Sequence, residues 1–542
     1  MTTWNFADAY EAIAAQVPDS PCQIQGDRVF TWRDFDRRTN CLGADLIEAG
    51  LTKQSKVAAY LYNCPEYLET YVGAFKGGFA PANTNYRYGP DEVWYLFDNA
   101  DAEAVVFHAT FAELLDGIRS RLPKVKRWYC VADDTASTPS WAVDYESVVA
   151  RPDPGPVRPT WGRTPDDLLL LYTGGTTGMP KGVMWRQDDL FNVVGAGGNA
   201  VIGIPPSTSI EELASRPDPN APGLVVLPAC PLMHGTGQFT SFIALNAGGS
   251  VVTLPSRQFD VHELLHTIEK HRVQVLVIVG QAFAGPILDA LEAQPGRYDL
   301  SSLIMITSSG VMWSQENKSG LLKHIPHVIL FDSFGSSEAV GLGGAVSAAG
   351  VATETAKFTL GPACAVFTED GRRVEPGSGE RGLVAVGGFI PLGYYRDEAK
   401  TAQTFRIFEG QRWSVPGDWA EILADGTLVL LGRGSVCINT GGEKVFPEEV
   451  EEELKRHPSV RDAVAVGIPD ARFGETICAV VEAEPGHTPS LEELAAHVKA
   501  RLAAYKAPRN LVVIETIGRA PNGKVDYKRL KSVALERLGV AS

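Results

Sequence analysis

Hydrophobic and polar positions follow two alternating periods in the first part of the chain. Between Lys56 and His108, apolar runs of strand length alternate with segments whose apolar residues recur at helical spacing. The expected strands cover residues 56–63, 79–85 and 102–108, and the expected helices cover 65–78 and 91–100. Strands that alternate with helices are typical of βαβ units, which assemble into a largely parallel sheet.

The same alternation returns in the middle of the chain. Further strands are expected at 224–230, 251–255, 273–280, 302–310 and 327–335. Two segments rich in Asp, Ser and Pro, 132–166 and 205–223, are expected as loops, and the second of them as an exposed loop. The pattern therefore predicts an α/β fold, in which a large N-terminal domain contains parallel-rich sheets and helices.

After about residue 432 the pattern changes to α+β. Pro447 suits the first turn of a helix, and Ser490 with Glu493 forms a capping box before a second helix. Strands are expected at 462–470, 475–484 and 510–517. We therefore expect an N-terminal domain over 1–432, a hinge at 433–435 beside flexible glycines, and a small mobile C-terminal domain over 436–542.

Composition and charge exclude several classes of protein. Lys and Arg number 49 and Asp and Glu number 65, which gives a net charge of −16. Binding to a nucleic acid is not expected, because affinity for its phosphate backbone needs a basic face. An apolar content of 44% excludes a disordered chain. No run approaches the roughly 18 apolar residues of a membrane span, although loose contact with a membrane stays open.

The N-terminal segment and the cysteines predict a cytoplasmic protein. The first residues contain acids where a signal peptide has basic residues and an apolar core. The eight cysteines form no C-x-x-C pair, which is typical of reduced thiols. His262 and His266 have the spacing of a metal pair on a helix, but no H-E-x-x-H motif accompanies them, so we expect a helix surface there.

The strongest chemical signal lies in residues 166–190. An apolar strand runs into Thr173-Gly174-Gly175-Thr176-Thr177-Gly178, and Lys181 follows. Glycines let backbone N–H groups approach anionic oxygens, threonine hydroxyls add donors, and the lysine adds charge. Lys181 is followed by Gly182 rather than Ser or Thr, so this is not a Walker A loop, and the G-x-G-x-x-G spacing of dinucleotide folds is absent. The segment therefore predicts a site for a nucleotide polyphosphate, with a flexible surface turn as the simpler alternative.

This loop and the motifs that follow it resemble those of the adenylate-forming superfamily, which contains acyl-CoA synthetases, firefly luciferases and the adenylation domains of peptide synthetases. The resemblance covers nearly the whole chain, and fatty-acid–CoA ligases are the most similar group. It implies ATP and Mg²⁺ as cofactors, coenzyme A as a co-substrate, and a small-molecule carboxylic acid as substrate. The sequence carries no signal for an oligomeric state.

Two motifs resemble the segments that surround the acyl pocket in this superfamily. The run Pro231-Leu232-Met233-His234-Gly235 matches a segment whose histidine lies near the pocket, so His234 is expected to line or gate it. Gly310 matches a glycine-rich segment beside the acyl and adenine sites. The pocket walls are expected in 229–243, 281–286 and 306–312, with the large apolar residues Phe239, Phe242, Phe283 and Met312 among them.

The nucleotide motif Y-G-x-T-E of the superfamily is similar to residues 334–338. Phe334 stands in place of Tyr and Ser337 in place of Thr. The resemblance implies that Phe334 stacks on adenine and that Glu338 holds Mg²⁺, a hard ion that suits a carboxylate. It also places four neighbours at the nucleotide, namely Asp332, Ser333, Gly335 and Ser337.

Three further motifs resemble the ribose site and the hinge region. Asp418, in a P-G-D version of the usual T-G-D, is implied to accept both ribose hydroxyls, and Arg433 to hold the ribose or a phosphate. Ser435 stands where the superfamily has Asp or Lys as the pivot. Gly441 and Gly442 match a loop that faces the active site during thioester formation, where they would let pantetheine pass.

The run Ala520-Pro521-Asn522-Gly523-Lys524 resembles the segment that carries the mobile catalytic lysine of the superfamily. Lys524 is therefore implied to enter the active site and to stabilise the charge that develops when a carboxylate attacks the α-phosphorus of ATP. The candidate catalytic residues are Lys524, Glu338, Thr176 and His234.

The resemblance implies an acid–thiol ligase that forms acyl-AMP and then acyl-CoA. A medium- or long-chain fatty acid ranks first as the substrate, a steroid side-chain or other bulky acid second, and an aryl acid third. The main alternative is an adenylation enzyme that loads a carrier protein, but no acid for an amino group follows residues 231–235. Luciferase-like oxidation shares these motifs, whereas the absence of G-x-S-x-G disfavours a hydrolase. The presence of Glu338 and Lys524 disfavours a non-catalytic nucleotide-binding protein.

Overall fold

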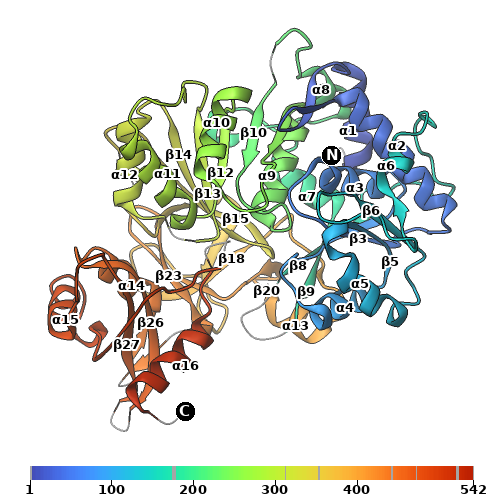
Figure 1. The fold of residues 1–542 in the computed structure, drawn as a ribbon. Coiled ribbons are helices and arrows are strands. Elements are labelled where there is room, and N and C mark those ends of the chain that lie inside the picture. The colour runs from blue at the N-terminus through green and yellow to red at the C-terminus, as the bar shows by residue number, and fades with distance from the viewer. Residues whose placement is uncertain are drawn as a thin grey trace.

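The computed structural model describes residues 3–173, 179–221, 223–311, 313–351, 354–436, 438–440, 443–470, 473–520 and 524–540. Figure 1 shows a large body, coloured from blue to orange, and a smaller orange-red lobe that lies against one side of it. The small lobe contains the C-terminal part of the chain, as the change of pattern near residue 432 predicts.

The largest sheet is parallel in one half, apart from its edge strand β2, and antiparallel in the other. Its strands run in the order β2-β1-β11-β10-β12-β13-β14-β15-β16-β23-β22-β18-β21-β20, with β17 beside β18. The first half contains β1 (Pro21–Gln25), β2 (Arg28–Thr31), β10 (Val225–Pro228), β11 (Ser250–Thr253), β12 (Val275–Ile278), β13 (Met305–Ser309) and β14 (Ile329–Ser336). The second half contains β15 (Ala339–Ser347), β16 (Lys357–Leu360), β17 (Cys364–Phe367), β18 (Arg381–Val386), β20 (Phe405–Phe408), β21 (Gln411–Ser414), β22 (Asp418–Ile422) and β23 (Thr427–Arg433).

The second sheet of the large body has a parallel centre and runs in the order β19-β9-β8-β4-β3-β5-β6-β7. Its strands are β3 (Lys56–Tyr60), β4 (Ala80–Asn83), β5 (Ala102–His108), β6 (Arg127–Val131), β7 (Val143–Asp144), β8 (Leu168–Thr173), β9 (Lys181–Arg186) and β19 (Gly393–Tyr394). The strand β9 pairs antiparallel with β8, so the chain reverses direction at the glycine-rich loop.

The small lobe is built on a third sheet, ordered β25-β24-β27-β26 with β28 beside β27. Its strands are β24 (Ile438–Thr440), β25 (Glu443–Val445), β26 (Val460–Asp470), β27 (Gly474–Ala483) and β28 (Asn510–Ile514). Apolar residues from α14 (Pro447–Lys455) and α15 (Leu491–Lys499) fill one core of this lobe, and α16 (Tyr527–Leu538) covers a separate core. The predicted capping box is confirmed, because Ser490 and Glu493 bond to each other's backbone N–H groups at the start of α15.

Helices cover the two sheets of the large body and pack between them (Figure 1). They are α1 (Phe6–Gln16), α2 (Trp32–Glu48), α3 (Pro65–Lys76), α4 (Pro90–Asn99), α5 (Ala112–Ile118), α6 (Tyr145–Val149), α7 (Gln187–Val193), α8 (Ile210–Ser215), α9 (Gly235–Asn246), α10 (Val261–His271), α11 (Gln281–Ala293), α12 (Gln315–His324) and α13 (Glu398–Thr404). The rings of Phe6, Phe75 and Phe242 meet where α1, α3 and α9 come together. Burying aromatic rings in this way gives the large body its main core.

The predicted strands and helices of 56–108 and 224–335 are confirmed, with ends that differ by a few residues. The two expected loops contain regular structure, because 132–166 includes β7 and α6, and 205–223 includes α8. Leu213 of α8 is fully buried, so this segment is not simply an exposed loop. Within the described residues, no helix is both long enough and apolar enough to cross a bilayer.

Candidate active site

The candidate site lies where parallel strands of the large body end. In the register of β13 and β14, Ser309 lies opposite Ser333, which places Gly310 close to Phe334. The carboxyl ends of parallel strands are the usual place for a ligand in an α/β fold. Gly310 has a φ of +90°, and a Cβ there would lie 3.9 Å from Oγ1 of Thr236 in α9. The strand ends and the start of α9 therefore meet at one place.

Asn83, at the end of β4, ties the strand before the glycine-rich loop to the segment that carries His234. Its amide nitrogen donates to the carbonyl oxygens of Tyr172 at 2.8 Å and of Met233 at 2.7 Å. Its amide oxygen accepts from the backbone N–H of Tyr172 at 2.6 Å. Since Asn83 is buried, these bonds are shielded from competing water. Asn83 thereby fixes two functional segments that the chain keeps far apart in sequence.

His234 stands immediately before the first residue of α9. Burial, together with the positive charges of Lys524 and Arg87, lowers the pKa of His234 to about 3. Lys524 belongs to the small lobe, yet its positive charge disfavours protonation of His234 in the large body. The structure thus brings together two of the candidate catalytic residues, one from each lobe.

We expect this low pKa to make a pH-dependent contribution to stability. The unfolded chain protonates this histidine near pH 6.5, whereas the native protein leaves it neutral down to about pH 3. Its stabilising contribution is therefore complete above pH 6.5 and is lost as the pH falls toward 3. Urea unfolding of the wild type and of His234→Gln, measured from pH 8 to pH 4, should show a constant difference above 6.5 and a growing relative loss for the wild type below it. A pH-independent difference would contradict a His234 that stays neutral in the native protein.

Glu338 is held through both its side chain and its backbone. The hydroxyl of Tyr394 donates to Oε1 of Glu338 at 2.7 Å, and the hydroxyl of Ser414 donates to the carbonyl oxygen of Glu338 at 2.6 Å. The indole N–H of Trp185 in β9 donates to the carbonyl oxygen of Ser337 at 3.0 Å. This last bond joins the end of β14 to the second sheet, so both sheets of the large body support Glu338.

The surroundings of Glu338 fit a magnesium ion that is shared with a nucleotide. Among the described residues, no lysine or arginine forms an ion pair with Glu338, and no group of three or more His, Cys, Asp or Glu side chains is placed to hold a metal. Mg²⁺ commonly takes one or two protein carboxylates and completes its shell with water and substrate phosphates. A single charged carboxylate with one oxygen fixed by a neutral phenol is suited to that role.

Asp418 and Arg433, the two predicted ribose residues, are partners in the register of β22 and β23. Asp418 is buried at the start of its strand, and the side chain of Arg433 lies outside the described part of the molecule. Directly before Arg433, Gly432 has a φ of +115°, and a Cβ there would lie 2.1 Å from Oε2 of Glu448 in α14. The small lobe therefore makes close contact with the strand that leads into the predicted hinge.

Trp419 connects the two lobes beside this hinge. Its ring lies 6.3 Å from the ring of Phe446, the residue before α14. A Cβ on Gly434 would lie 2.7 Å from Nε1 of Trp419. The hinge glycines thus leave room for an indole ring on one side and a carboxylate on the other.

Two charged residues of the predicted nucleotide site have protein partners. The ammonium group of Lys181 forms an ion pair with Asp397, just before α13, and this interaction lowers the pKa of Asp397. Asp332 is buried and pairs with Nζ of Lys318 at 3.0 Å. Burial raises the pKa of Asp332, and the charge of Lys318 opposes this rise. The Asp332 carboxylate is therefore occupied by an interaction within the protein.

The aromatic candidates divide between the site and the core. The Phe334 ring lies 5.5 Å from the ring of Phe358, and Phe239 contacts Trp185 edge-on at 6.2 Å. Phe242 was expected to line the acyl pocket, but it is fully buried against rings of α1 and α3 on the core side of α9. The helical period explains this correction, because residue 242 lies on the opposite side of α9 from Thr236 and Thr240.

Several predicted residues lie outside the described part of the chain. These are Gly174, Gly175, Thr176, Thr177 and Gly178 of the phosphate loop, Gly441 and Gly442, and Met312. The strand ends on both sides of the phosphate loop are described, with Thr173 paired to Lys181 across β8 and β9. The roles of these residues therefore remain those that the resemblance implies.

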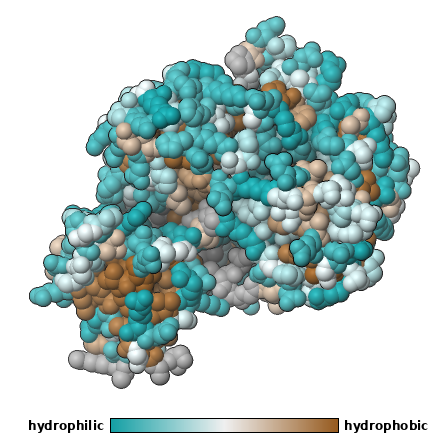
Figure 2. Space-filling view, in the orientation of Figure 1, coloured by the Kyte–Doolittle hydropathy of each residue, from teal (hydrophilic) through white to brown (hydrophobic). Residues whose placement is uncertain are grey.

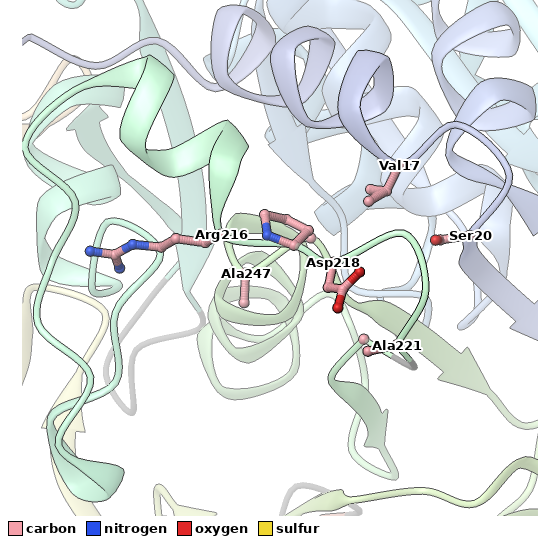
Figure 3. A pocket seen from close by; sticks show the side chains of 9 residues that line it. Val17, Ser20, Arg216, Asp218, Ala221 and Ala247 are labelled. Atoms are coloured by element: carbon pink, nitrogen blue, oxygen red, sulfur yellow. The ribbon is translucent and has the colours of Figure 1, made fainter.

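Two cavities lie in the described molecule away from Glu338. One, of about 500 Å³, is lined from both lobes by the polar side chains Gln315, Glu316, Glu354, Arg456 and Arg501. Figure 2 shows the small lobe at the lower left of the large body. The other, of about 230 Å³, lies near α1 and α8 (Figure 3). There Arg216 extends away from Val17 and Ser20 and bonds to the carbonyl oxygens of Gly197 and Pro205. No candidate residue lines either cavity.

His262 and His266 lie on α10 and both contact Tyr298. Nδ1 of His262 is 2.6 Å from the Tyr298 hydroxyl, and the ring of His266 lies 5.0 Å from the ring of Tyr298. The described residues place no metal-binding group there.

Sequence reasoning missed Asn83, Tyr394 and Asp397. Of these three residues only Asn83 carried a signal, as a polar residue at the end of an apolar strand.

Comparison with known proteins shows which families and relatives this chain is similar to. Residues 10–395 match the AMP-binding enzyme family, and residues 449–524 match the AMP-binding enzyme C-terminal domain. A medium/long-chain-fatty-acid–CoA/3-oxocholest-4-en-26-oate–CoA ligase of Mycolicibacterium smegmatis is 40% identical, with 98% of this chain and 97% of that protein covered. A 3-oxocholest-4-en-26-oate–CoA ligase of Rhodococcus rhodochrous is also 40% identical, with 97% and 95% covered.

Solved structures show the same fold at lower sequence identity. The crystal structure of an anthranilate CoA ligase in complex with anthranoyl-AMP superimposes with a TM-score of 0.82 at 20% identity, and the match covers 99% of this chain and 98% of that one. Both lobes thus have counterparts in a solved structure.

Proposed function

The chain belongs to the AMP-binding enzyme family, and from this membership we infer that it is an AMP-forming acyl-CoA synthetase. In the first half-reaction a carboxylate oxygen attacks the α-phosphorus of ATP, the bond to the β-phosphate oxygen breaks, and acyl-AMP and pyrophosphate form. In the second, the CoA sulfur attacks the acyl carbon, the thiol loses its proton, and AMP leaves. The products are acyl-CoA, AMP and pyrophosphate.

One observation carries the proposal for the first half-reaction: the positive charge of Lys524, in the small lobe, acts on His234 in the large body. A lysine that reaches a site formed by the other lobe can place its charge where negative charge develops in the transition state. We assign Lys524 this role. His234 stays neutral at physiological pH, so at the edge of the acyl site it adds no charge that would compete with Lys524 for the carboxylate.

The other predicted residues divide the binding of ATP between them. Glu338 would hold Mg²⁺, which neutralises charge on the leaving pyrophosphate when it is bound. Asp418 would accept the ribose hydroxyls, and the loop 173–178 would surround the phosphates. Lys181 must leave Asp397 before it can reach a phosphate, since one ammonium group cannot fully serve both partners.

The second half-reaction requires a different surface of the small lobe at the same site. Gly441 and Gly442 would face the thiol channel, and Lys524 would withdraw. We propose that the lobe rotates about residues 433–435, where Gly432 and Gly434 remove side chains that would block the motion. The contact of Glu448 with Gly432 must break in that rotation.

A medium- or long-chain fatty acid is the substrate that we rank first. Support comes from the relatives, whose names give fatty acids and 3-oxocholest-4-en-26-oate as substrates, and a steroid side-chain acid is therefore the second candidate. The strip of α9 that faces Gly310 contains Thr236, Thr240 and Ile243, which are partly exposed and uncharged. An uncharged strip suits an acyl tail rather than the amino group of an amino acid.

We place the reaction in the cytoplasm. In the described part of the chain, Cys22, Cys41, Cys64, Cys130, Cys230, Cys364 and Cys478 are all free thiols, and all but Cys364 are buried. Unpaired cysteines in this number are typical of a reducing compartment. ATP and CoA are supplied in the same compartment.

A panel assay of AMP release tests this function. Octanoate, palmitate, 3-oxocholest-4-en-26-oate and an aryl acid are each supplied with ATP and Mg²⁺, with and without CoA. AMP release that depends on both acid and CoA supports the ligase, and the acid with the highest kcat/KM identifies the substrate class. Acid-dependent pyrophosphate release that CoA does not turn over would instead indicate a carrier protein as the acyl acceptor.

A further inference from the structure

Tyr394 lies in a segment that contacts two charged residues of the proposed nucleotide site, Glu338 and Lys181. Its hydroxyl bonds to Glu338, and three residues later Asp397 pairs with Lys181. Both partners belong to motifs that the family match covers, whereas neither Tyr394 nor Asp397 was singled out by the sequence. The hydroxyl of Tyr394 is therefore placed to influence the orientation of the Glu338 carboxylate.

The backbone of Tyr394 is fixed on two sides. In β19 it lies opposite Val183 of β9, and the flanking N–H groups of Leu392 and Tyr395 donate to carbonyl oxygens of β9 at 2.9 and 2.8 Å. Its own N–H donates to Oγ1 of Thr401 at 2.9 Å. The side chain is only 6% exposed, and its ring contacts Phe405 edge-on at 6.0 Å. The phenol oxygen is therefore presented to Glu338 from a rigid support.

A neutral donor suits a carboxylate that has to bind a cation. A lysine or arginine in this place would neutralise Glu338 and compete with a metal ion, whereas a phenol orients the carboxylate and leaves its charge intact. Tyr394 takes Oε1, and within the described residues no hydrogen bond or ion pair engages the other oxygen, Oε2, which is therefore available to a ligand. Hydrogen bonds that orient metal ligands typically govern metal affinity in this way.

We propose that Tyr394 is a positioning residue, whose hydroxyl holds the Glu338 carboxylate in the orientation that binds the metal–ATP complex. This inference rests on the proposed function, in which Glu338 is the metal ligand. It assigns no chemical step to Tyr394. Its effect passes entirely through Glu338.

The test compares Tyr394→Phe with Tyr395→Phe. Tyr395 is the next residue, and its hydroxyl donates to a carboxylate oxygen of Asp101 at 2.8 Å, so both variants remove one phenol–carboxylate bond. Binding of Mn²⁺ to the enzyme with ATP, followed by the EPR signal of free Mn²⁺, gives a readout that needs no turnover. We expect Tyr394→Phe to weaken this binding by about 10–100-fold, as loss of such orienting bonds does, and Tyr395→Phe to leave it within about twofold of the wild type.

A double-mutant cycle separates positioning from general damage. Glu338→Gln removes the group on which Tyr394 is proposed to act, so in that background Tyr394→Phe should have little further effect on Mn²⁺·ATP binding. Equal binding losses for Tyr394→Phe in the presence and absence of Glu338 would overturn the proposal. So would binding by Tyr394→Phe that matches Tyr395→Phe.

The same samples show whether the proposed function itself fails. Acid-dependent exchange between ATP and pyrophosphate in the wild type establishes adenylation independently of the variants. If the wild type shows no exchange with any acid of the panel, the function is overturned. If it shows exchange and the cycle shows no coupling, only the role of Tyr394 is overturned.

Discussion

Replacement of Lys524 by alanine should lower the rate of acid-dependent ATP–pyrophosphate exchange by about 10²–10³, the usual effect of removing one group that stabilises a developing charge. The loss corresponds to about 3–4 kcal/mol of transition-state stabilisation. Thioester formation from supplied acyl-AMP and CoA should remain near the wild-type rate, because the lysine is proposed to have left the site by then. Exchange of labelled pyrophosphate and release of AMP from acyl-AMP measure the two half-reactions separately.

Lys528→Ala is the matched control for this variant. Lys528 lies four residues after Lys524 in the same lobe, and it is exposed on α16. Its replacement therefore removes a similar charge at a position outside the proposed active site. A second readout is the pKa of His234, which should rise in Lys524→Ala because the nearby positive charge is gone. Equal loss of both half-reactions in Lys524→Ala would contradict the division of labour between the two states of the small lobe.

The second large effect concerns stability and lies far from the site. Arg38 of α2 bonds through Nε and Nη2 to both oxygens of Glu69 at 2.6 and 3.0 Å, and Glu69 in α3 is fully buried. Arg38→Met would leave that buried carboxyl group without its cationic partner and with only the hydroxyl of Tyr145 as a donor, at a cost of about 3–5 kcal/mol in the free energy of unfolding. Urea unfolding followed by circular dichroism measures the loss.

Arg33→Met, on the same helix, provides the comparison. Arg33 pairs with Asp19 on the surface, where both side chains are mostly exposed, so its loss should cost no more than about 1 kcal/mol. Adding Glu69→Met to Arg38→Met should recover most of the stability, since an apolar pair has no charge to desolvate. If Arg38→Met were as stable as Arg33→Met, the buried pair would have no net effect on folding.

The fold was predictable from sequence wherever the apolar pattern was strong. The parallel strands of 56–108 and 224–335 are short, apolar and separated by helices of clear period, so their pattern identifies them. The helix α8 was not predicted, because a single buried residue, Leu213, anchors it within a polar segment. The antiparallel strands β15–β23 were not predicted, because within the described part of residues 339–433 a single short helix, α13, separates one strand from the next.

The candidate site was predictable only as far as its motifs extend. Glu338, His234 and Lys524 stand in runs whose order resembles a known family, and the structure places Lys524 near His234. The partners that hold such residues are set by tertiary contacts. Nothing in the sequence around Tyr394 or Asp397 shows that these side chains meet Glu338 and Lys181, because strand β19 reaches β9 from more than 200 residues away.

The position of Trp419 makes its intrinsic fluorescence sensitive to the movement of the small lobe. Its indole lies between Gly434 of the hinge and Phe446 of the small lobe, and it is anchored in a strand of the large body. Rotation of the small lobe would withdraw Phe446 and change the polarity around the indole. Among the ten tryptophans of the chain, Trp419 would therefore be the one placed to change its emission as the small lobe rotates about the hinge.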